Sequence, residues 1–94
     1  MSKGRVRLID VQMPGGMQND AVNTAARAVE LYGSCCDIAK YIRIEFDRMY
    51  ESCWQCFVVN GNASSASVWF NRNHYIDLKV DSYKILLFRT RNIN

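Results

Sequence analysis

The chain has 94 residues, of which 49% are hydrophobic, and its formal net charge is +3. This length predicts a single domain over residues 1–94, with a core between about 5 and 90. The mild charge, without a basic stripe, argues against a nucleic-acid-binding surface, and no apolar run approaches the roughly 20 residues that a membrane span needs. No charged segment precedes an apolar one, so a signal peptide is not expected and the protein should be soluble and intracellular.

The first half of the chain predicts one strand and two helices. Arg5–Val11 has the partial alternation of a short strand, and Pro14, Gly15 and Gly16 should break it before the first helix. Apolar residues then recur at helical spacing on one face: Met17, Ala21, Val22, Ala25, Ala28, Val29 and Tyr32. The second helix repeats the pattern: Ile38, Tyr41, Ile42, Phe46 and Met49. Between the helices, Gly33 suits a C′ position with left-handed backbone, and Ser34 suits an N-cap.

The second half predicts strands separated by turns. Trp54–Val59 is strongly β-prone, and Tyr75–Val80 alternates between apolar and polar residues. Tyr83–Phe88 should be the last strand, buried on both faces near its end. The weaker segment Ser64–Phe70 is serine-rich and fits an exposed edge strand. The order β-α-α-β-β-β-β, with early helices and late strands, indicates the α+β class: two N-terminal helices packed on an antiparallel sheet.

The four cysteines allow three hypotheses about their role. Cys53 and Cys56 form a CxxC motif, but it opens a strand, where residues three apart point to opposite faces about 10 Å apart. Reduced structural thiols are the favoured reading, and one redox-sensitive thiol is the second. A zinc site that adds Cys35, Cys36 and His74 is the third, although adjacent cysteines are poor ligand spacing. His74 lacks a nucleophile and an orienting group in any recognisable pattern, so we expect no enzyme, no metal and no cofactor.

The segment Ser64–Phe70 has two readings, a surface loop or a strand that pairs with another chain. An edge strand has unpaired backbone groups, and a chain this short buries a modest share of its surface. We therefore expect a dimer in which the two subunits exchange this strand.

Five motifs give the chain a more specific resemblance: MQNDAV (Met17–Val22), AVELY (Ala28–Tyr32), DIAKYIRIEFDRMY (Asp37–Tyr50), WQCFV (Trp54–Val58) and ILLFR (Ile85–Arg89). Together they span nearly the whole domain, and their combination resembles the small, hub-type dynein light chains of cytoplasmic and axonemal motors. The resemblance implies a strand-exchanged dimer, homomeric or with a related light chain, that binds extended peptides as added strands in two grooves. It implies a non-catalytic subunit that clamps dynein intermediate chains, located in the cytoplasm and cytoskeleton or in the ciliary axoneme. The alternative is a motor-independent hub that binds short linear motifs, and a thiol-based redox protein is a third hypothesis.

The resemblance also implies site residues. The peptide groove matches Cys35, Cys36, Ser64, Ser65, Ala66, Ser67, Val68, Trp69, Phe70, Tyr75, Asp77 and Lys79. The dimer interface matches Arg43, Gln55, Phe57, Ser67 and Trp69. This chain departs from the family in the groove: two cysteines replace a charged pair at the start of the second helix, and Asp77 and Lys79 replace tyrosines. Gln55 replaces an interface histidine. The scaffold is kept and the recognition surface is altered, which predicts a changed ligand preference.

Overall fold

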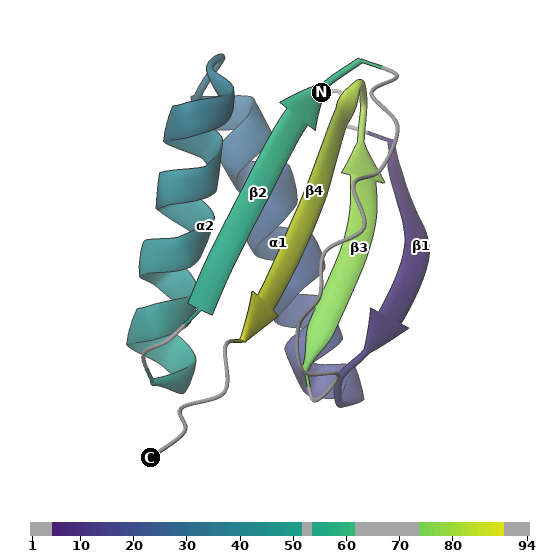
Figure 1. Cartoon of the computed structure of the whole chain (residues 1–94), viewed down its shortest axis with the longest axis vertical. Helices are drawn as coiled ribbons and strands as arrows, with labels where there is room; N and C mark the ends of the chain where they lie inside the picture. Colours follow the sequence, from purple (N-terminus) through teal and green to yellow (C-terminus); the bar gives the residue numbers. More distant parts are fainter. Residues whose placement is uncertain (1–4, 52–53, 62–73, 90–94) are drawn as a thin grey trace.

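The computed structural model describes residues 5–51, 54–61 and 74–89, and these form one sheet and two helices (Figure 1). The elements are β1 (Val6–Gln12), α1 (Gly15–Leu31), α2 (Cys35–Tyr50), β2 (Trp54–Asn60), β3 (Tyr75–Val80) and β4 (Tyr83–Arg89). The predicted α+β class is confirmed. The segment predicted as an exchanged strand, Ser64–Phe70, lies outside the described residues.

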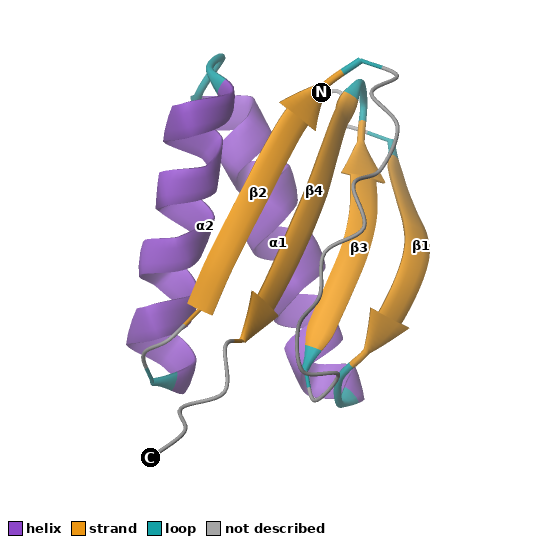
Figure 2. Cartoon of the chain, in the orientation of Figure 1, coloured by secondary structure: helices purple, strands orange, loops and turns teal. Residues whose placement is uncertain are grey.

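The sheet is antiparallel throughout, with strand order β1-β3-β4-β2. Both helices lie on the same side of it (Figure 2). Helix α2 packs against β2, and α1 packs against β3 and α2. None of the helices in the described ranges is long and apolar enough to cross a membrane.

The apolar face of α1 is built from small residues. Ala21, Ala25 and Ala28 are buried, so this helix can lie close to the sheet and to α2. The helix begins at Gly15, two residues earlier than expected, with Pro14 as its N-cap. The Gln18 N–H donates to the Pro14 carbonyl at 2.9 Å, and the Gln18 side chain donates to the Met13 carbonyl at 2.9 Å.

The link between the helices confirms one cap and corrects the other. Ser34 is the N-cap of α2, as predicted, and its hydroxyl oxygen accepts a hydrogen bond from the Asp37 N–H at 3.2 Å. The predicted left-handed Gly33 is wrong, because its φ is not positive. Helix α1 instead ends at Leu31, and its C-cap Tyr32 is extended, with φ −125° and ψ 149°, so the chain leaves the helix without a left-handed reversal. The Tyr83 hydroxyl donates to the Gly33 carbonyl at 3.1 Å and ties this link to the sheet.

Helix α2 and the sheet enclose the larger part of the core. Ile38, Ile42 and Phe46 are fully buried on α2, as their spacing predicted, whereas Met49 is 39% exposed. The Phe46 ring meets the buried Trp54 ring edge to face, with centroids 4.9 Å apart. The helix-facing side of the sheet supplies the remaining large core residues: Ile76, Leu78, Val80, Ile85 and Leu87.

Candidate functional site

The face of the sheet that the helices do not cover has an apolar half over β2 and β4. We call it the apolar half-face, and it contains Phe57, Val59, Leu86 and Phe88. Phe57 lies opposite Leu86 and Gln55 lies opposite Phe88, so these side chains share the face that the helices do not cover. The Phe57 and Phe88 ring centroids are 5.7 Å apart. Phe57 is 51% exposed, and Val59, two residues further along β2, is 41% exposed. A patch of this kind marks an interaction surface more often than a solvated one.

The other half of the same face, over β3 and β1, is charged. Asp77 lies opposite Asp10, and the Lys84 Nζ is 3.9 Å from the Asp77 Oδ2. Burial raises the pKa of Asp77, the Lys84 ammonium opposes this shift, and the Asp10 carboxylate adds to it. The Tyr75 hydroxyl donates to the Asp10 Oδ2 at 3.1 Å. This half can therefore discriminate among partners by charge, while the apolar half can supply contact area.

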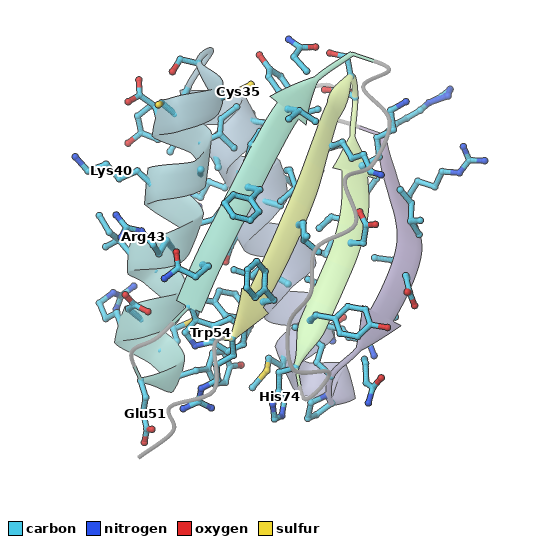
Figure 3. All side chains as sticks on the ribbon, viewed as in Figure 1. Cys35, Lys40, Arg43, Glu51, Trp54 and His74 are labelled. Atoms are coloured by element: carbon cyan, nitrogen blue, oxygen red, sulfur yellow. The ribbon has the colours of Figure 1, made fainter. Side chains whose placement is uncertain are left out.

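Three predicted interface residues lie on β2 or beside it, and β2 is an edge strand of the sheet that the described residues form. Gln55 and Phe57 are exposed on its helix-free face. Arg43 projects from α2 beside β2 (Figure 3). It is close enough to Cys56 on that strand to oppose the rise in the pKa of its thiol. A partner seated on this edge would thus contact all three. The other two predicted interface residues, Ser67 and Trp69, lie outside the described residues.

The predicted groove residues fall into two separate groups within one chain. Cys35 and Cys36 begin α2, next to β2, at the end of the molecule opposite Glu51 and His74 (Figure 3). Tyr75, Asp77 and Lys79 alternate along β3, which β4 separates from β2, so about 10 Å lies between β3 and β2. The rest of the predicted groove, from Ser64 to Phe70, is outside the described residues. Among the described residues, β4 therefore lies between these two groups.

The structure weighs against two of the three hypotheses for the cysteines. Cys56 points to the helix side, and burial raises the pKa of its thiol to about 12, so it stays protonated and is a poor nucleophile. This environment weighs against the redox hypothesis for the CxxC motif, whose other cysteine, Cys53, is outside the described residues. Cys35 and His74 lie at opposite ends of the molecule, so they cannot share one metal ion.

Comparison with known proteins decides the family. The sequence profile of the family described as dynein light chain type 1 matches residues 5–90. The chain belongs to the dynein light chain family. This membership confirms the resemblance read from the motifs. Dynein light chains are in general non-catalytic subunits, and the family implies partners in dynein complexes.

One dynein light chain agrees with this assignment, and two solved structures agree with the fold. The chain is 31% identical over 93 residues to a protein named the 11 kDa dynein light chain of the flagellar outer arm, from Chlamydomonas reinhardtii. The match covers 92% of this chain and 76% of that one. Among solved structures, the dynein light chain-like domain of the Fasciola hepatica calcium binding protein FhCaBP2 has a TM-score of 0.81 at 20% identity, covering 94% and 93% of the two chains. The dynein light chain-like domain of CsTAL3 has a TM-score of 0.75 at 14% identity, covering 93% and 94%.

Val59, Leu86 and Phe88 belong to the apolar half of the face but were not among the predicted site residues. A signal for them exists in the sequence. In Trp54–Val59, apolar residues occupy both alternating sets of positions, which indicates a strand with two apolar faces. One face packs on α2, and the other is exposed at Phe57 and Val59.

Proposed function

We propose that this chain is a dimeric light-chain subunit of a dynein complex that clamps intermediate-chain segments by β-strand addition. The observation that supports this most is the position of the apolar half-face, which adjoins the open edge of β2. A second subunit can cover the face, its exchanged strand can pair along the edge, and an extended segment can then pair with that strand. Family membership supplies the motor context, and the apolar face with its open edge supplies the reason for dimerisation.

A second copy of the chain is the best occupant of the apolar half-face. Phe57, at the centre of β2, and Val59, near its end, are both substantially exposed. A two-fold interface would place the same patch of each subunit against the other and remove both sets of side chains from water. The segment Ser64–Phe70 follows β2 in the chain and is proposed to pair with the partner's sheet.

The proposed ligand preference follows from the charged half-face. Backbone hydrogen bonds of strand addition do not depend on side-chain type, so that part of the affinity is independent of the substitutions at the groove. Asp77 and Lys79 provide charge where the family has tyrosines. The preferred segment should carry complementary charges. Asp77→Ala or Lys79→Ala should then weaken a native intermediate-chain peptide in calorimetry, and unchanged binding would contradict the altered preference.

The motor context can be tested in cells. The named relative belongs to a flagellar outer arm, which favours an axonemal complex for this chain also. An epitope-tagged copy recovered from native extract should bring down dynein heavy and intermediate chains in fixed proportion. A Phe57→Asp copy, which places charge on the apolar half-face, should recover neither. Recovery of unrelated proteins without heavy chain would contradict the motor assignment.

The second candidate is a dimeric hub outside the motor. It is favoured by the occurrence of the same fold in the Fasciola hepatica calcium binding protein, whose name does not describe a motor subunit. The same recovery experiment separates the two candidates. A hub would bring down several unrelated proteins in amounts that do not follow the heavy chain.

A further inference from the structure

The outer edge of β1 is a second open strand edge, on the opposite side of the sheet from β2 (Figure 1). No other described strand pairs with this edge. Three apolar residues of β1 are exposed: Val6 at 37%, Leu8 at 45% and Ile9 at 49%. Such an edge carries unpaired backbone groups next to apolar side chains, which are the components of a strand-addition site.

The backbone groups that face the open edge can be identified. The Asp81 N–H donates to the Arg5 carbonyl at 3.0 Å, so the backbone polar groups of Arg5 point toward β3. Antiparallel partners alternate between hydrogen-bonded and non-hydrogen-bonded pairs, so Arg7 also bonds toward β3. Val6 and Leu8 therefore direct one N–H and one C=O each toward the open edge. The register shifts between Leu8 and Asp10, so this run ends at a bulge at Ile9.

A basic depression adjoins the same stretch. It has a volume of about 470 Å³ and is lined by Arg5, Val6, Arg7, Lys79 and Asp81. The three ion pairs found among the described residues involve none of these cations. The Asp81 carboxylate accepts a hydrogen bond from the Arg5 backbone N–H at 3.1 Å. Three cations thus face one carboxylate, and the depression has an excess of positive charge.

We propose that the outer edge of β1 binds an extended segment of another protein in which acidic and apolar residues alternate. An added strand sends alternate side chains to opposite faces. On the helix-free face they would meet Arg7 and Lys79, which lie opposite each other. On the other face they would extend the apolar surface of Val6 and Leu8. This surface is separate from the β2 edge and does not depend on the proposed dimer, and it shares only Lys79 with the predicted groove.

Two other occupants fit less well. A second copy of the chain paired edge to edge would bring the Arg5 and Arg7 side chains of both copies to one seam, and like charges across paired strands are destabilising. A nucleic acid would satisfy the charge. It offers neither a backbone that pairs with Val6 and Leu8 nor apolar side chains beside them. An acidic, extended protein segment satisfies all three features.

The test uses the full chain and a fluorescein-labelled peptide of about ten alternating glutamate and valine residues. A peptide of the same composition with its glutamates and valines in two blocks is the sequence control, and a single-stranded oligonucleotide is the polyanion control. Arg5→Glu/Arg7→Glu should weaken binding of the alternating peptide roughly tenfold or more. The matched variant Arg27→Glu/Lys40→Glu changes the net charge equally at exposed helix positions and should stay within about twofold.

Heteronuclear NMR of the unmodified chain locates the site without any variant. The proposal expects shifts and slowed hydrogen exchange at the amides of Val6 and Leu8. It is overturned if shifts map to β2 instead, or if both charge-reversed variants weaken binding equally. It is also overturned if the block peptide or the oligonucleotide binds as tightly as the alternating peptide, because either result would show charge attraction alone.

Discussion

Truncation of Phe57 should weaken the dimer strongly while leaving the fold intact. Full burial of a phenylalanine side chain stabilises by about 1.5–3 kcal/mol. Phe57 keeps 51% of its surface exposed in one subunit, so about half of this, roughly 0.75–1.5 kcal/mol, remains to be gained at an interface. A two-fold dimer contains the residue twice. Phe57→Ala should then weaken the dimer by about 1.5–3 kcal/mol, which raises its dissociation constant roughly 12- to 150-fold.

Sedimentation equilibrium over a range of concentrations measures this constant directly. Leu31→Ala is the matched control, because Leu31 is 56% exposed at the end of α1, which lies on the opposite side of the sheet from the face that carries Phe57. It should leave the dissociation constant within about threefold of the unmodified chain. Equal weakening by both variants, or no weakening by Phe57→Ala in a protein that does dimerise, would show that the apolar half-face is not the interface.

Four further outcomes are expected. Tyr50→Phe removes the hydroxyl that donates to Asp20 and joins the two helices, and it should lower the free energy of unfolding in urea by about 1 kcal/mol. The hydrogen bond to Asp20 and burial raise the pKa of Tyr50 above 10.0, so its contribution is complete below that pH and is lost as pH rises through the raised value; the variant should lack this alkaline step. The pKa of Asp77 is raised above 3.8, so the free energy of unfolding falls as pH rises from 3.8 through the raised value. Asp77→Asn should therefore be more stable at neutral pH, and its free energy of unfolding in urea should change less with pH just above 3.8. Because the pKa of Cys56 is raised to about 12, Cys56→Ser should leave the rate of labelling by a thiol reagent near pH 8 unchanged. The dimer should persist between about pH 7 and 5, and a dissociation near pH 6 that His74→Ala abolishes would contradict this.

Much of the fold is readable from the sequence because local periodicity and burial agree. The spacing of Ala21, Ala25 and Ala28 identified the buried face of α1, and the alternation of Ile76, Leu78 and Val80 identified the buried face of β3. The conformation at the end of α1 is harder to predict from the sequence. A glycine permits a left-handed turn but does not require one, and the direction in which the chain leaves Tyr32 depends on contacts with the sheet.

The candidate site was harder to read, because it depends on which strands become neighbours. The sequence does not show that β4 separates β3 from β2, so Asp77 could not be placed relative to Cys35 from the pattern alone. The apolar half-face was visible only in part. Phe57 was named from family resemblance, whereas Leu86 joins it through cross-strand register, which is a tertiary property.

The most direct measurement of the central claim is the stoichiometry of the chain with a purified dynein intermediate-chain segment, by light scattering after gel filtration. The proposal predicts a complex of two light chains with two segments, and it predicts that Phe57→Asp abolishes both dimer and complex. A monomeric light chain that binds one segment with unchanged affinity in the Phe57→Asp variant would contradict it.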